Sequence, residues 1–207
     1  MTNLITRAGK GAPLTAAEHD SNLAALKQTA EAEFLNDYWD DLRFPAAGLS
    51  PPGPENAPTV NSTLGTLTFA DDSTRLVAGL AQLPHAWLEG SAIEPHVHWI
   101  QPAPGDVVWR LEYRVMPAVG GAFPDAWTTV TSSTGVSAYP GSGSWVQITR
   151  FPSIDMSGFG ISAMVLFRLA RLGADSADTL ASAVDLLEFD IHYQLDAPGS
   201  QQEFVKS

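Results

Sequence analysis

Short runs of alternating apolar and polar side chains dominate the chain from residue 64 onward. Successive side chains on a β-strand point to opposite faces, so this alternation predicts strands with one buried face. Gly, Pro, Asp and Asn residues separate the runs and favour turns between them. The predicted strands span residues 64–70, 75–83, 94–101, 106–116, 126–131, 145–151, 161–172 and 183–196.

Two of these runs alternate over their whole length. In the run 106–116 the apolar face carries Val107, Trp109, Leu111, Tyr113 and Val115. In the run 183–196 the apolar face carries Leu187, Phe189, Ile191, Tyr193 and Leu195, and the polar face carries Glu188, Asp190, His192 and Gln194. Many short strands separated by turns predict a mainly β, antiparallel domain, either a jelly roll or a β-sandwich, with the strand order left open.

The N-terminal part follows a different pattern. Residues 1–13 end at Pro13 and are predicted to form an extended arm. Thr15-Ala-Ala-Glu18 matches a capping box, which predicts a helix that starts there and runs to about Phe34. A helix of this length is marginal on its own in water. It is therefore expected to pack on its own domain, or on copies of itself, through its narrow apolar stripe of Leu23, Leu26, Ala30 and Phe34.

Proline density marks the boundary between the two parts. Residues 45–62 contain Pro45, Pro51, Pro52, Pro54 and Pro58, and such a density disfavours regular elements. The predicted organisation is an arm and helix over 1–36, a Pro-rich connector over 37–62, and a β-domain over 63–207.

Composition narrows the possible partners. With 23 acidic against 11 basic residues the formal charge is −12, which argues against binding to nucleic acid or to anionic membranes. No cysteine is present, so His, Asp and Glu are the strong metal ligands that remain. The chain shows neither an apolar signal-peptide region nor 18 consecutive apolar residues, so we expect synthesis and assembly in a cytoplasm.

The segment Lys10-Gly-Ala-Pro-Leu-Thr-Ala-Ala-Glu-His-Asp-Ser-Asn-Leu23 resembles a stretch near the N-termini of many tailed-bacteriophage fibre proteins. The matching positions are Gly11, Pro13, Leu14, Thr15, Glu18, Asp20, Asn22 and Leu23. From Trp39 to Gln194 the chain also resembles a group of virion-associated phage proteins, with Gln82-Leu-Pro-His-Ala-Trp87, Pro95-His-Val-His-Trp99 and Asp190-Ile-His-Tyr-Gln194 as its marks.

This resemblance implies a non-catalytic structural component of a virion, such as a tail fibre, a head fibre or a tail adaptor. It also implies a homotrimer that contacts other virion proteins and is assembled in the host cytoplasm. Attachment and oligomerisation would use Thr15, Glu18, Leu23, Leu26 and Ala30.

His96 and His98 are the main candidates for chemistry. At i and i+2 of a strand they share a face, and imidazole is the commonest metal ligand in proteins. Gly90, separated by five residues from His-x-His, also matches the opening of the cupin metal motif. His192 or His85 would supply a third ligand, and Glu188 or Asp190 an oxygen.

The rest of the cupin pattern is missing, because no Glu follows His98 at the expected distance and the second motif is absent. A cupin-like metal-dependent protein and a structural metal ion therefore stand beside the simpler interpretation, in which these histidines pack neutrally beside aromatic residues such as Trp99 and Tyr193.

Among the six tryptophans, Trp127 and Trp145 flank predicted turns and, with Tyr139, are candidates for contact with a host surface glycan. The chain has no Gly-x-Ser-x-Gly motif, no phosphate-binding loop and no carboxylate pair that stands out, so we do not expect an enzyme. Asp40-Asp41 is expected in a turn or in solvent.

Overall fold

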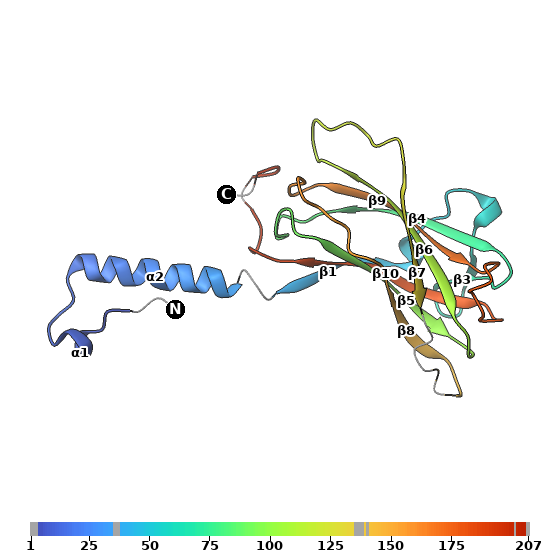
Figure 1. Cartoon of the computed structure of the whole chain (residues 1–207), viewed down its shortest axis with the longest axis horizontal. Helices are drawn as coiled ribbons and strands as arrows, with labels where there is room; N and C mark the ends of the chain where they lie inside the picture. The colour runs from blue at the N-terminus through green and yellow to red at the C-terminus, as the bar shows by residue number, and fades with distance from the viewer. Residues whose placement is uncertain (1–3, 35–37, 135–138, 140, 201, 206–207) are drawn as a thin grey trace.

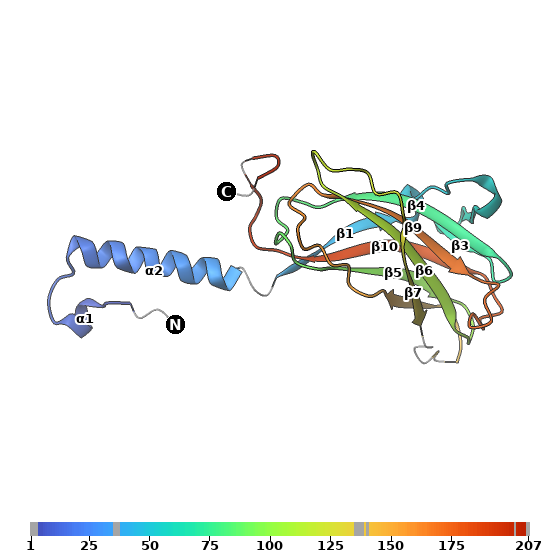
Figure 2. The same ribbon diagram turned by 45° about the horizontal axis from the view of Figure 1, so that its top comes forward.

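The computed structural model describes residues 4–34, 38–134, 139, 141–200 and 202–205. Within them the chain folds as two antiparallel sheets packed face to face, with a helix that extends away from them (Figures 1 and 2). The mainly β prediction, in its β-sandwich form, is confirmed.

The larger sheet has the order β2-β3-β10-β5-β8, and β1 also pairs with β10. These strands are β1 (Trp39–Pro45), β2 (Thr59–Asn61), β3 (Thr66–Phe69), β5 (Ile93–Gln101), β8 (Trp145–Arg150) and β10 (Val184–Gln194). The smaller sheet has the order β4-β9-β6-β7. Its strands are β4 (Thr74–Gln82), β6 (Val107–Met116), β7 (Thr128–Thr134) and β9 (Met164–Leu172).

Aromatic side chains from the inner faces of the two sheets meet in the core. Phe189 of β10 lies against Phe167 of β9, with 4.5 Å between ring centroids, and Phe69 of β3 lies 5.2 Å from Trp109 of β6. Trp99 of β5 lies 6.4 Å from the same Trp109. Each such pair adds about 0.5–1.5 kcal/mol beyond the area it buries, so these contacts hold the sheets in one relative position.

One charge pair is buried with the core. The guanidinium of Arg171 on β9 donates to both carboxylate oxygens of Asp178 and to the carbonyls of Phe69, Leu180 and Ser182. Both side chains of the pair are fully buried. The interactions satisfy the guanidinium on all sides, which is the condition for a buried charge to be tolerated.

Strand β10 contains a β-bulge at Leu187. Leu186 pairs with Trp99 and Glu188 pairs with His98, so one extra residue lies between two consecutive positions of β5. Before the bulge Val184 and Leu186 are buried, and after it Phe189, Ile191 and Tyr193 are buried. The prediction that Leu187 belongs to the apolar face is wrong, because a bulge exchanges the two faces of a strand.

Two strands lie in the stretch that was predicted as a Pro-rich connector. β1 pairs with β10 along its full length, from Trp39 opposite Gln194 to Pro45 opposite Glu188. β2 pairs with β3. The prolines stand at the end of β1 and in the turns around the short helices η1 (Ala46–Gly48) and η2 (Pro54–Asn56), where they cost no ladder hydrogen bond. This stretch is part of the sandwich and does not separate it from the helix.

The N-terminal helix α2 (Ala16–Phe34) occupies the predicted residues and starts with the predicted capping box. The Thr15 amide donates to Glu18 Oε2 at 2.7 Å, and the Glu18 amide donates to Thr15 Oγ1 at 3.3 Å. Lys10, at the end of the one-turn helix α1 (Arg7–Lys10), pairs with the same carboxylate. The hydrogen bond from Lys10 is the main cause that lowers the pKa of Glu18 to about 2.

The arm folds back on this helix. Asn22 accepts from the Ile5 amide at 2.9 Å and donates to the Ile5 carbonyl at 2.7 Å. Leu23 and Leu26 remain 64% and 50% exposed, so the expected packing of these leucines on the chain's own domain does not occur. Self-association through the stripe stays a prediction, and the side chain of Ala30 lies outside the described residues.

Candidate functional site

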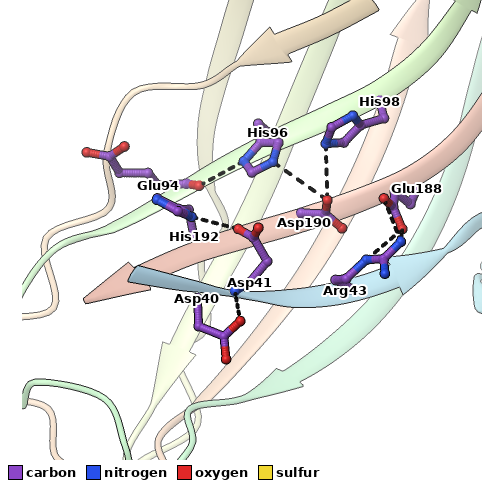
Figure 3. A network of polar contacts seen from close by, with 9 residues as sticks. All are labelled: Asp40, Asp41, Arg43, Glu94, His96, His98, Glu188, Asp190 and His192. Atoms are coloured by element: carbon purple, nitrogen blue, oxygen red, sulfur yellow. Dashed lines mark hydrogen bonds and ion pairs between the residues drawn. The ribbon is translucent and has the colours of Figure 1, made fainter. Parts of the chain in front are cut away.

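The outer face of the larger sheet carries a dense group of polar side chains, contributed by β1, β5 and β10. Asp190 of β10 stands opposite His96 of β5 in the strand register, and His98 lies diagonally next to it. Cross-strand and diagonal neighbours on one face of a sheet are close enough for long side chains to touch. Figure 3 shows both imidazoles turned toward the Asp190 carboxylate.

The two histidines reach the same oxygen of Asp190. His98 Nε2 lies 3.1 Å from Oδ2, and His96 Nε2 lies 3.6 Å from it. The other ring nitrogen of His96, Nδ1, lies 3.4 Å from the carbonyl oxygen of Glu94. Of the described residues, His96, His98 and Asp190 form the group of His, Asp and Glu side chains whose ligand atoms, all within 4.8 Å of one another, could hold a metal ion.

Asp190 is unusual for a residue on the outer face of a sheet, because it is only 3% exposed. Burial disfavours the ionised form and is the main cause that raises the pKa of this carboxyl to about 6, with repulsion from Glu188 as a second cause and attraction to His96 acting against both. Its second oxygen, Oδ1, is buried without a hydrogen-bond partner among the described residues. Such a group carries a desolvation cost that its neighbours offset only in part.

His192, the third predicted metal ligand, is held apart from this group. Its Nδ1 lies 2.7 Å from Asp41 Oδ1 of β1, and its ring stacks on Trp39 with 4.9 Å between centroids and 8° between planes. Its ring centroid lies 6.3 Å from that of His96. The structure therefore places Asp190, and not His192, beside His96 and His98.

His85, the alternative third ligand, lies in the loop after β4, away from the outer face of the larger sheet. Its ring nitrogens contact the hydroxyls of Ser162 and Ser200, at 3.1 and 2.8 Å. These two hydrogen bonds give it a structural role in joining the C-terminal segment to the loop before β9.

Arg43 and Glu188 form an ion pair on the same outer face, next to Asp190. Both Nη2 and Nε of Arg43 on β1 donate to the Glu188 carboxylate. Nη2 lies 2.7 Å from Oε2 and 3.0 Å from Oε1, and Nε lies 3.1 Å from Oε2. The carboxylate of Glu188 raises the pKa of Arg43 above its ordinary value. Because the guanidinium of Arg43 binds Glu188, it neutralises the charge of Glu188 directly and not that of Asp190.

A concave pocket of about 430 Å³ opens on this face. Its volume lies within the usual range of small-molecule sites, roughly 300–1,000 Å³. Carboxylate, imidazole and guanidinium groups line it together with apolar side chains. The lining residues are Asp41, Glu94, Pro95, His96, His98, Ile148, Arg150, Phe151, Ser153 and His192.

The three residues predicted to contact a glycan do not form one platform. Trp127 lies beside the start of β7, where the guanidinium carbons of Arg114 and Arg168 lie 4.5 and 4.2 Å from its ring centroid. The Tyr139 hydroxyl lies 2.6 Å from the carbonyl oxygen of Gly143 and 3.1 Å from that of Pro102, beyond the other end of β7. Trp145 begins β8, is 46% exposed and donates to the carbonyl of Ser142. None of the three lines the pocket.

Sequence reasoning missed Asp41, Glu94 and Arg150. Asp41 was expected in a turn or in solvent, but it lies on β1 opposite His192. Arg150 lies opposite His96. Their positions follow from which strands pair, and the alternation along each strand does not contain that information.

No family model and no curated protein matches this chain. Among solved structures, the chain is similar to TmCBM61 in complex with β-1,4-galactotriose, at 11% identity and a TM-score of 0.33, over 79% of this chain and 93% of that one. A likeness at this level carries no argument about function. No helix in the described part of the chain is long and apolar enough to cross a membrane.

The raised pKa of Asp190 predicts a specific dependence of stability on pH. The folded chain binds this proton more tightly than the unfolded chain, so the contribution of Asp190 to stability is fully present below the unfolded pKa near 3.8 and is lost as pH rises through about 6. Asp190→Asn removes that loss. Relative to the parent chain it should gain on the order of 1–2 kcal/mol of unfolding free energy between pH 4.5 and 7.5.

Urea unfolding in chelator-containing buffer at the two pH values measures this difference. Asp155→Asn is the control, because hydrogen bonds from Ser157 lower the pKa of the exposed Asp155, so this substitution should change stability by nearly the same amount at both pH values. Its contribution to stability is present above the unfolded pKa and disappears as pH falls. A stability difference between Asp190→Asn and the parent that does not change with pH would show that the carboxylate is not desolvated as described.

Proposed function

We propose that the β-sandwich is a non-catalytic binding domain that takes a glycan in the pocket on the outer face of its larger sheet. The observation that carries the proposal is the pocket itself, which lies over the polar residues of β1, β5 and β10. The N-terminal arm and helix would attach this domain to a virion, as the resemblance to phage fibre proteins suggests.

The lining chemistry supports a polyhydroxylated ligand. Asp41 and Glu94 supply carboxylate acceptors and Arg150 supplies guanidinium donors, a combination that can bind the paired hydroxyls of a sugar ring. Ile148 is 46% exposed and offers an apolar surface within the same pocket. A few polar groups placed on a partly apolar wall are the usual composition of a specific ligand site.

The aromatic ring of Trp39 stacks on His192, which lines the pocket. Trp39 is partly exposed, and the Nδ1 of His192 is fixed by Asp41. The two rings are therefore held in place before any ligand arrives, which reduces the entropy lost on binding. This surface replaces Trp127, Tyr139 and Trp145 as the glycan contact we favour.

A glycan array of bacterial envelope saccharides, probed with the full-length chain, tests this proposal. We expect binding to a subset of glycans, and a loss of at least about tenfold in affinity for Asp41→Ala and Arg150→Ala, since each removes a hydrogen-bonding group from the pocket. Because the domain is proposed to be non-catalytic, the bound saccharide should be recovered chemically unchanged.

Arg110→Ala, on the smaller sheet, and Trp145→Ala are the matched controls and should leave glycan affinity within about twofold. Absence of any glycan signal would contradict the proposal. So would binding that survives both pocket variants and disappears in Trp145→Ala.

The exposed stripe of α2 supports the attachment part of the proposal. Leu23 and Leu26 lie on one face of the helix, one turn apart, and neither is covered by the chain's own domain. Association of this face with two further copies would bury it, as expected of a phage fibre component. The interactions of Glu18 with Lys10 and Thr15 hold the start of the helix.

We predict that the full-length chain sediments as a trimer and that the double variant Leu23→Asp, Leu26→Asp sediments as a monomer with unchanged β-sheet circular dichroism. A monomeric parent chain would contradict trimerisation. For the virion itself, a chain lacking residues 1–36 should be absent from purified particles, and its presence at normal copy number would contradict attachment through this segment.

A further inference from the structure

We propose that His96, His98 and Asp190 bind a divalent transition-metal ion of the Zn²⁺ type beside the pocket on the outer face of the larger sheet, which both histidines line. The inference does not depend on the glycan proposal, because the metal ion alone is the ligand.

The donor atoms are arranged as a metal site requires. Zn²⁺ binds imidazole nitrogen and carboxylate oxygen at about 2.0–2.2 Å, so neighbouring ligand atoms in a tetrahedral site lie roughly 3.3 Å apart. The two measured distances to Asp190 Oδ2, 3.1 Å from His98 Nε2 and 3.6 Å from His96 Nε2, bracket that value. All three donor atoms lie within 4.8 Å of one another, so small side-chain rotations bring them to one ion.

Asp190 supplies an independent reason for a cation at this place. Its side chain is almost fully buried, since the residue is only 3% exposed. Its Oδ1 has no hydrogen-bond partner among the described residues. Arg43, the nearby cation on β1, is bound to Glu188 instead. A metal ion beside Oδ2 would compensate the buried charge that the protein's own donors leave only partly satisfied.

The surroundings orient at least one ligand. The carbonyl of Glu94 lies 3.4 Å from His96 Nδ1 and favours the tautomer that leaves Nε2 free to bind a metal. His98 lies 5.0 Å from His96 between ring centroids, and both rings line the pocket. Positions not filled by the protein would therefore face the pocket, where water or another oxygen ligand can enter.

The donor set indicates the class of metal. Two imidazoles and one carboxylate suit Zn²⁺, Co²⁺ or Fe²⁺, whereas Ca²⁺ and Mg²⁺ prefer sites built from oxygen ligands alone. His192 lies outside the set, because it does not belong to the group whose donor atoms all lie within 4.8 Å of one another, and its ring centroid is 6.3 Å from that of His96. This arrangement provides a histidine of the same pocket as a matched control.

The test is a titration of untagged, chelator-treated full-length chain with Zn²⁺ by calorimetry, and with Co²⁺ by visible absorption. We expect one ion per chain and a raised melting temperature in Zn²⁺, because a ligand that binds only the folded state stabilises it. His96→Ala, His98→Ala and Asp190→Ala should each weaken binding by at least about 100-fold, because substituting a group that only hydrogen-bonds to a metal ligand already costs about 10–100-fold. His192→Ala should change it by less than about threefold.

Circular dichroism of each variant shows whether the sandwich is intact. Should Asp190→Ala fail to fold, Asp190→Asn keeps the shape of the side chain and loses the anionic ligand, so it must still weaken binding. Absence of stoichiometric binding by the folded parent chain would overturn the proposal. Binding that persists in the three ligand variants, or that disappears in His192→Ala, would also overturn it.

Discussion

The register of β10 is the constraint on which the core and the outer face both depend. This strand pairs with β5 on one side and with β3 and β1 on the other. Each of its side chains therefore points either into the core or to the outer face of the sheet. A one-residue slip would exchange those faces along the whole strand. The bulge at Leu187 makes that exchange once, at a defined place, which puts Phe189, Ile191 and Tyr193 into the core and leaves Glu188, Asp190 and His192 on the outside.

The same register explains why a carboxylate is buried on an outer face. Asp190 stands between His96 of β5 and Arg43 of β1 in the strand register, and it is buried there. Two imidazoles approach one of its oxygens, while Arg43 is occupied by Glu188. The carboxylate is thus desolvated without being fully satisfied, an arrangement that structural polar groups normally avoid and functional sites often retain.

Much of the fold follows from alternation in the sequence. The strands from β3 to β10 lie within a few residues of the predicted runs, and the capping box at Thr15 and Glu18 marks the start of α2. β1 was missed because Asp40-Asp41 and the nearby prolines resemble a turn. The bulge at Leu187 was missed because Leu186 and Leu187 are both apolar, so an alternation that puts Leu187 on the apolar face fits the sequence equally well.

The candidate site was predictable only in part. Alternation places His96 and His98 on one face, and it places Asp190 and His192 together on another strand. Which of the last two meets the histidine pair depends on the relative register of β5 and β10, which no local pattern contains. The structure pairs Asp190 with His96 and pairs His192 with Glu94, so the carboxylate joins the histidines. The covering of Trp127 by two arginines likewise arises from residues on different strands.

The central claim is that the outer face of the larger sheet is a binding site built around Asp190. The most direct test is a crystal structure of the full-length chain soaked in Zn²⁺, with anomalous difference maps recorded on both sides of the zinc absorption edge. The account predicts a peak that vanishes below the edge and lies between His96 Nε2, His98 Nε2 and Asp190 Oδ2. A map with no peak there, or with zinc bound only at His19 or His85, would contradict it.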